Sequence, residues 1–187
     1  MKKLLLLIPI ILFACERIDY GEVETYTVKK GEHASDFPLL QDIGDIYVQV
    51  FFPESCRYDS QPSGMSGWNK LIGLMPGYND IHKNSARWAW RYNHITREID
   101  LATYTYVKGE RIIIYQMSRP LGTWVEIYVG YDRKLTKWIY EVKGANLGGW
   151  VRCPEFKDKN FWWLGLYFGG NSVAPHDITV YYKFEDK

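Results

Sequence analysis

The sequence has 187 residues, a length that suits one domain large enough to bury a hydrophobic core. Its 23 basic and 22 acidic side chains give a formal net charge of +1, so no overall field attracts nucleic acid or an anionic membrane. We therefore expect local recognition and no nucleic-acid partner. Aromatic residues are the outlier at 17% of the chain, and some of their rings should lie on exposed faces.

The N-terminus has the pattern of an export signal. Lys2 and Lys3 precede an apolar run, LLLLIPIILFA, which is too short for a transmembrane helix and ends at Cys15. We expect a signal peptide over residues 1–14 and a tether over 15–23. The ending LFAC resembles the lipobox of bacterial lipoproteins. This resemblance implies lipidation of Cys15 and a lipid-anchored protein of the cell envelope, in the outer membrane. A plain secretory signal or an uncleaved anchor is the alternative.

From residue 24 onward, stretches with strand character alternate with turns. We predict strands over 24–29, 46–52, 69–75, 85–92, 97–107, 111–117, 124–131, 134–142, 161–168 and 177–184. Turn residues separate them, as in QPSGMSG, PGYND and GANLGG. Only DFPLLQDI is compatible with a helical turn. Strands at this spacing predict an all-β fold, an antiparallel two-sheet β-sandwich formed by one domain over residues 24–187.

Two cysteines remain besides Cys15. Cys56 and Cys153 both lie in loop-like sequence, and an exported protein meets an oxidising compartment, so we predict a disulfide between them. Two free thiols are the alternative. No ligand spacing links these cysteines to the histidines, so we expect no metal centre and no cofactor, with a structural calcium ion left open.

The stretch HKNSARWAWRYN interleaves arginines with tryptophans. Because successive side chains of a strand point to opposite faces, Arg87 and Arg91 share one face while Trp88 and Trp90 face the core. The same alternation assigns further side chains to the face opposite the core: Glu98, Asp100, Tyr104, Tyr106, Glu126, Trp163 and Tyr167. His82 and Lys83, which begin the stretch, are added as candidate ligand-binding residues.

This face is rich in planar donors and rings and poor in lysine, a composition typical of recognition surfaces. Sugar rings stack on Trp and Tyr, while their hydroxyls bind carboxylates and guanidinium groups. Two arginines would also neutralise the carboxylate of a uronate. We therefore predict that the face binds a polysaccharide or oligosaccharide. The alternative is that Arg87 and Arg91 form cross-strand pairs with Glu98 and Asp100 on a hydrated sheet.

The strand order, the outward Glu98-Ile99-Asp100 and the closing YFGGNSVAPHDITVYY resemble concanavalin A-like jelly rolls. That family includes laminarinase-type glycosidases, alginate-lyase-like proteins and many lectins. The combination of HKNSARWAWR with FGGNSVAPHD is similar to small lipoproteins of Bacteroidetes. These resemblances imply a jelly roll over roughly residues 45–184 and carry less information about activity.

The resemblance leaves catalysis open. Laminarinase-type enzymes carry Glu-x-Asp-x-Glu or Glu-x-Asp-x-x-Glu, and Glu98 and Asp100 match the first two positions. Ala102 or Thr103 occupies the third, so the proton donor of a retaining hydrolase is missing.

Alginate-lyase-like chemistry needs a Gln or Asn and an Arg to neutralise the carboxylate, with His or Tyr for proton transfer. His82, Arg87, Arg91, Tyr104 and Tyr167 supply these types, but the family's QIH and YFKAG motifs are absent. Glycan binding is therefore the leading function, with unknown catalytic residues if any. A polysaccharide lyase or glycoside hydrolase is the alternative, and a structural or protein-binding envelope module is third.

Overall fold

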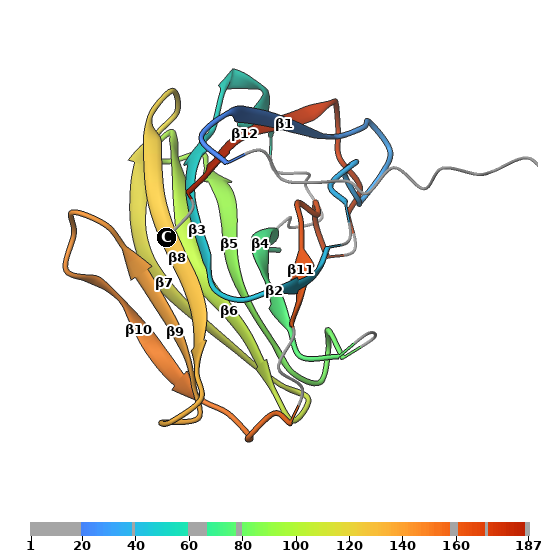
Figure 1. Ribbon diagram of the computed structural model, residues 1–187. Helices are drawn as coiled ribbons and strands as arrows, with labels where there is room; N and C mark the ends of the chain where they lie inside the picture. Colours follow the sequence, from blue (N-terminus) through green and yellow to red (C-terminus); the bar gives the residue numbers. More distant parts are fainter. Residues whose placement is uncertain are drawn as a thin grey trace, which may run out of the picture.

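Two six-stranded antiparallel sheets make up the computed structural model, which describes residues 20–38, 40–59, 67–77, 80–157, 161–170 and 172–185 (Figure 1). This architecture confirms the predicted all-β jelly-roll sandwich. The strands of sheet A, in spatial order, are β1 (Val23–Val28), β12 (Ile178–Phe184), β3 (Ile46–Phe51), β8 (Trp124–Asp132), β9 (Lys137–Val142) and β10 (Leu147–Arg152). Those of sheet B are β2 (Gln41–Ile43), β11 (Phe161–Leu164), β4 (Asn69–Met75), β5 (Ser85–Asn93), β6 (Glu98–Val107) and β7 (Glu110–Pro120).

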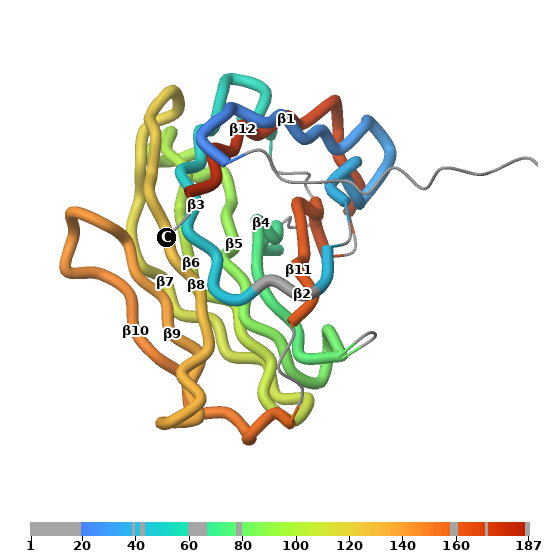
Figure 2. Tube along the Cα trace, viewed as in Figure 1, coloured from blue at the N-terminus to red at the C-terminus, as the bar shows by residue number. Residues whose placement is uncertain are grey.

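Strands from opposite ends of the described chain lie side by side. β1 pairs with β12 along its whole length, from Val23 opposite Lys183 to Val28 opposite Ile178 (Figure 2). At the other edge of the molecule, β10 ends sheet A and β7 ends sheet B. β7 is an edge strand with Ile114 and Tyr115 exposed.

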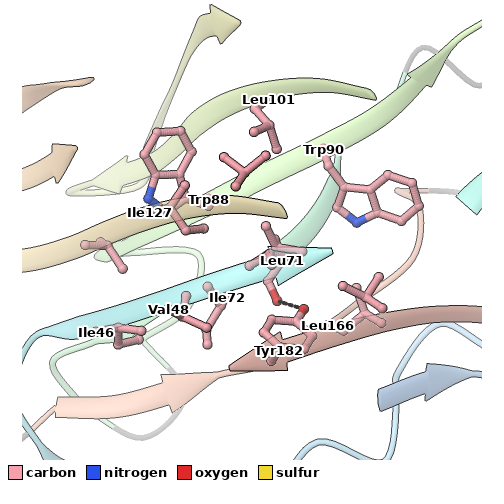
Figure 3. Close-up of a cluster of buried hydrophobic side chains, with 14 of the residues drawn as sticks. Ile46, Val48, Leu71, Ile72, Trp88, Trp90, Leu101, Ile127, Leu166 and Tyr182 are labelled. Atoms are coloured by element: carbon pink, nitrogen blue, oxygen red, sulfur yellow. Dashed lines mark hydrogen bonds between the residues drawn. The ribbon is translucent and has the colours of Figure 1, made fainter. Parts of the chain in front are cut away.

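The hydrophobic core lies between the sheets and is rich in large rings. Trp88 and Trp90 are fully buried, which confirms their predicted core orientation, and they lie near Leu71 and Leu101 in Figure 3. Two polar side chains of the core bond across the sandwich: the Trp88 indole donates to the carbonyl of Tyr128 (2.9 Å), and the Tyr182 hydroxyl donates to the carbonyl of Leu71 (3.0 Å). These bonds join sheet B to sheet A.

Three predicted elements differ from the structure. The strand predicted over 161–168 ends at Leu164, and the next residue, Gly165, lies so close to Phe37 that a Cβ there would be 2.1 Å from Cγ of that ring. The predicted turn GANLGG, residues 144–149, overlaps strand β10, which begins at Leu147 and in which Gly148 has φ +139°. The stretch DFPLLQDI contributes strand β2 where a helical turn was expected, although its Leu39 lies outside the described residues. The described helical structure is one 3₁₀ turn, η1 (Glu54–Cys56).

The predicted disulfide is wrong, because Cys56 and Cys153 are both free and buried. The Cys56 thiol donates to the carbonyl of Thr179 on β12 (3.2 Å), whereas Cys153 directly follows β10. In sheet A these two strands are separated by β3, β8 and β9, and neighbouring strands are roughly 4.8 Å apart. The separation is far beyond the Cα distance of about 7 Å that a disulfide tolerates.

None of the helical structure in the described ranges is long and apolar enough to cross a membrane. Within the same ranges, no group of three or more His, Cys, Asp and Glu side chains is placed to hold a metal ion. Cys15 and the predicted signal peptide lie outside the described residues.

Candidate functional site

A cleft of about 500 Å³ opens on the face of sheet B that points away from the core. Its polar and aromatic walls come from four strands and one loop: Lys70 of β4, Arg87 of β5, Tyr104 and Tyr106 of β6, Arg111 of β7, and Tyr167 after β11. His82 lies at its margin. We call this group the cationic cleft.

Strand register brings these side chains together. Arg87 lies opposite Tyr104, and Tyr106 lies opposite Arg111, so the arginines and tyrosines alternate across three neighbouring strands. On the other side of Arg87, strand β4 places Gly73 opposite it. A Cβ on Gly73 would lie 2.5 Å from Cγ of Arg87, so the missing side chain makes room for the arginine stem.

Arg87 is the deepest charged group of the cationic cleft. Its side chain is 4% exposed, and its Cζ atom lies 5.0 Å from the centroid of the Tyr104 ring. Its Nε and Nη2 atoms are buried and have no hydrogen-bond partner among the described residues. Burial lowers the pKa of this guanidinium. Buried donors without acceptors are rare in proteins because each costs about 1 to 3 kcal/mol, so this group calls for a functional explanation.

Lys70 is a second buried cation in the same cleft. Its side chain is directed here by a register shift between Lys70 and Ile72 in β4, and only 8% of the residue is exposed. Its Nζ atom donates to the carbonyl of Gly169 (3.2 Å) and lies 4.9 Å from the Tyr104 ring centroid. Burial, with the charges of Arg87 and Arg111, lowers the pKa of Lys70 to about 8.

Arg111 and the rings form the rim. Arg111 is exposed, and a hydrogen bond with Tyr104 raises the pKa of its guanidinium. Burial raises the pKa of Tyr106. The exposed His82 ring lies 5.4 Å from the Tyr106 ring in an edge-on contact. On the opposite wall, Tyr167 stacks on His33 with their planes 9° apart and keeps 38% of its surface exposed.

The cationic cleft therefore has an excess of positive charge. Three cations face it, and no Asp or Glu of the described residues lines it. The site can bind an anionic group through buried donors while offering ring faces at its rim. Its donor set suits oxygen anions and is unsuited to a metal cation.

Five of the residues predicted from the sequence come together in this cleft: His82, Arg87, Tyr104, Tyr106 and Tyr167. Lys83 is exposed in the turn before β5 and does not line it.

Arg91 forms a cross-strand ion pair with Asp100, which was the alternative to a role in binding. Its Nη2 atom lies 3.0 Å from Oδ2 of Asp100, and its Cζ lies 4.5 Å from the Trp68 ring centroid. Asp100 is 2% exposed and also accepts a hydrogen bond from Ser118 (2.7 Å). Glu98 is opposite Asn93 at the end of the same sheet face, away from the cleft. The pair is thus satisfied within the protein.

Two side chains predicted for this face lie elsewhere. Trp163 is 2% exposed, and its ring packs in the core 5.4 Å from the Phe184 ring. The prediction continued one alternation through residue 168, whereas β11 ends at Leu164 and both Trp163 and Leu166 are buried. Glu126 lies on β8, which belongs to sheet A, and it pairs with Lys143 far from the cationic cleft.

Sequence reasoning missed Lys70 and Arg111. Lys70 is the one charged residue in the otherwise mostly apolar strand NKLIGLM. Because charged residues are rarely buried without a function or a partner, its position could have identified it as a candidate site residue. Arg111 could be assigned only through its register with Tyr106, which the sequence does not reveal.

No family model matches the chain, and no curated protein matches it. Among solved structures, LamAcat from Zobellia galactanivorans gives a TM-score of 0.49 at 8% identity over 87% of this chain and 75% of that one. A heptameric SAP-like pentraxin from Limulus polyphemus gives 0.48 at 10% identity, covering 89% of this chain and 76% of that one. A xylan β-1,4-xylosidase from Bacillus halodurans C-125 gives 0.46 at 9% identity and 82% coverage of this chain, which spans 29% of that enzyme's length. Likeness at this level carries no conclusion about the site.

Proposed function

We propose that this protein binds an acidic glycan in the cationic cleft, with a uronate as the acidic sugar, while tethered to the bacterial cell envelope by a lipid on Cys15. The observation that carries the binding proposal is Arg87, a buried arginine that lines a cleft without carboxylates and has two nitrogens without a hydrogen-bond partner among the described residues. A ligand carboxylate would supply the missing acceptors. The anchor rests on the sequence pattern that ends at Cys15.

The walls of the cleft fit a sugar for a second reason. Tyr167 presents an exposed ring that stacks on His33, and Tyr106 contributes a half-buried ring to the same cleft. Apolar C–H faces of a pyranose pack on such rings at a low cost in side-chain entropy. Charge would then fix the acidic group at the floor, and the rings would orient the sugar above it.

A polysaccharide lyase is the second candidate, because Lys70 has a lowered pKa and lies next to Arg87 and two tyrosines. Arg87 would neutralise the uronate carboxylate, a neutral Lys70 would take the C5 proton, and a tyrosine would protonate the departing oxygen. A glycoside hydrolase is not supported, since two carboxyl groups are required and no carboxylate of the described residues lines the cleft. A structural or protein-binding module is the third candidate.

The test uses the soluble protein from residue 20 onward. Oligouronates and neutral oligosaccharides of equal length are titrated into it by calorimetry, and the same mixtures are assayed for unsaturated and reducing ends. We expect the oligouronates to bind more tightly, and Arg87→Met to lose roughly ten- to hundredfold in affinity through lost charge-assisted bonds. Equal binding of neutral and acidic sugars would contradict the proposal, and unsaturated products would favour the lyase.

A further inference from the structure

Lys70 occupies an unusual position for a lysine, between two tyrosine rings and a backbone carbonyl. Its Nζ atom is 4.9 Å from the Tyr104 ring and 5.9 Å from the Tyr167 ring, and the carbonyl of Gly169 accepts its hydrogen bond. No ion pair is formed by Lys70 within the part of the chain that the structure describes. An ammonium in this place is stabilised by ring faces and one carbonyl, and it lacks the anion that a buried lysine usually has.

Every charged neighbour of Lys70 has the same sign. Arg87 on β5 and Arg111 on β7 both disfavour its charged form, while the flanking groups on β6 and after β11 are the tyrosines Tyr104, Tyr106 and Tyr167. The histidines near this group are His33, against Tyr167, and His82, against Tyr106. An anion that enters the cleft would therefore be the first opposite charge that Lys70 meets.

We propose that Lys70 determines the specificity of the cationic cleft for anions, and that a ligand anion binds there together with a proton. The inference rests on the proposed function in that the natural ligand is an acidic glycan, but the proton coupling itself is a property of the protein and of any small carboxylate that fits. Arg87 is always protonated and carries a permanent charge, whereas the protonation of Lys70 is favoured by the bound anion.

The expected pH dependence follows from linkage. The pKa of Lys70 in the free protein is about 8, so the ammonium is present below that pH and is lost above it. A bound anion stabilises the ammonium and raises the pKa of Lys70, so binding takes up a proton in the interval between the two values. Affinity is then constant at lower pH and falls by up to about tenfold for each pH unit above the free value.

The first experiment measures binding of an oligouronate by calorimetry from pH 7.0 to 9.5, in pairs of buffers that differ in ionisation enthalpy. We expect proton uptake to rise with pH and to exceed roughly half a proton per ligand at pH 8.5. Lys70→Met should bind at least about tenfold more weakly at pH 7.0 and show no proton uptake. Lys70→Arg, with a fixed charge, should bind without uptake. His33→Gln and His82→Gln should keep the uptake, and Lys134→Met, in the exposed β8–β9 turn, should behave like the wild type.

The second experiment uses acetate as the probe and needs no glycan. The Lys70 signal, assigned by its loss in Lys70→Met, is titrated by NMR in lysine-labelled protein with sodium acetate and, separately, with sodium chloride at equal ionic strength. Acetate should raise the pKa of Lys70 relative to chloride. If acetate does so but no glycan binds, the glycan proposal fails and this inference stands. If oligouronates bind while the pKa of Lys70 and the proton count stay unchanged, this inference is overturned and glycan binding stands.

Discussion

Arg87 and Arg91 lie four residues apart on one face of β5, yet their surroundings give them opposite effects on stability. Arg91 is paired with the buried Asp100, whereas Arg87 has buried nitrogens without acceptors. Removing one member of a buried pair leaves a charge without its partner, while removing an unpaired buried charge relieves a desolvation cost. We therefore expect Arg87 to affect mainly ligand binding and Arg91 to affect mainly the stability of the fold.

We predict that Arg87→Met leaves the free energy of unfolding unchanged or raises it, while its affinity for oligouronates falls. Arg91→Met should do the reverse, with a loss of about 1 to 2 kcal/mol of stability, since the Arg91 side chain is 36% exposed and solvent weakens the pair. Urea unfolding and calorimetric titration of both variants measure the two effects. A strongly destabilised Arg87→Met protein would contradict this assignment.

Lys70 adds a pH-dependent contribution to stability. Its pKa is about 8 in the folded protein against 10.5 for a solvated lysine, so between these values the unfolded chain binds more protons. Stability should therefore rise with pH across this interval, whereas anion affinity falls. The difference in unfolding free energy between wild type and Lys70→Met, measured from pH 7 to 10.5, isolates this contribution from other groups. A difference that does not change with pH would refute it.

The two buried thiols should be inert in the folded protein. Burial raises the pKa of Cys153 to about 12 and shifts that of Cys56 even further upward, so little thiolate is present near neutral pH. We predict that the soluble protein from residue 20 onward reacts slowly with a thiol reagent when native and yields both thiols when denatured without reductant. Its melting temperature should not depend on reductant. If the denatured protein yields no free thiols, the prediction of a disulfide between Cys56 and Cys153 would be correct after all.

At the scale of strands, the sequence predicted side-chain faces correctly where two strands pair without interruption. β5 and β6 keep one register from Ser85 opposite Tyr106 to Asn93 opposite Glu98, so simple alternation places Arg87 and Tyr104 on one face. The same rule failed in β11, which ends at Leu164 although the prediction continued to residue 168, and missed Lys70 in β4, where the register shifts. One extra residue exchanges the two faces, and alternation alone contains no signal for it.

The sequence also did not predict which strands belong to which of the two sheets. Glu126 was grouped with Arg87 because both alternate away from the core, yet β8 pairs with β3 and β9 in the opposite sheet. Alternation identifies the outward side chains of a strand and not which of two outer faces they join. The fold class was predictable from strand spacing, but the composition of the cleft depended on these long-range pairings.

Gly73 connects strand packing to the cleft. A Cβ there would lie 2.1 Å from the carbonyl oxygen of Ala86 and 2.5 Å from Cγ of Arg87. We predict that Gly73→Ala separates β4 from β5, costs about 1 to 3 kcal/mol of stability and weakens anion binding by displacing Arg87. Gly44→Ala is the matched control, because a Cβ on Gly44 meets nothing within 4 Å. Thermal melts and titrations that do not distinguish the two variants would count against this role.

For the whole molecule, a formal net charge of +1 conceals a strongly uneven distribution. Three cations gather at the cationic cleft, while pairs such as Lys29–Asp177 and Lys143–Glu126 are satisfied on other surfaces. Bulk attraction to polyanions is therefore weak, and selectivity depends on an acidic group reaching the floor of the cleft. Added salt should lower affinity less than it would for an exposed cationic patch.

The proposed anchor gives a prediction for the complete protein in its cell. Because the apolar run ends at Cys15, Cys15→Ala should abolish incorporation of a metabolically supplied palmitate analogue and leave the protein unprocessed or released from the membrane fraction. Cys153→Ala, which removes a buried thiol of the domain, is the control and should still be labelled. Labelling of Cys15→Ala would exclude lipidation at this position.

The edge strand β7 places a limit on how the cleft can be altered. Ile114 and Tyr115 are 47% and 55% exposed on β7, which has no neighbouring strand on its outer side among the described residues, an arrangement that favours aggregation between molecules. Arg111 and Arg119 flank this apolar run, and their mutual repulsion between copies opposes edge-to-edge association. Arg111 is thus a solubility determinant as well as a rim cation. An Arg111 variant without the charge would be more prone to self-association at high concentration. A loss of ligand binding in such a variant could then come from aggregation as well as from the missing cation.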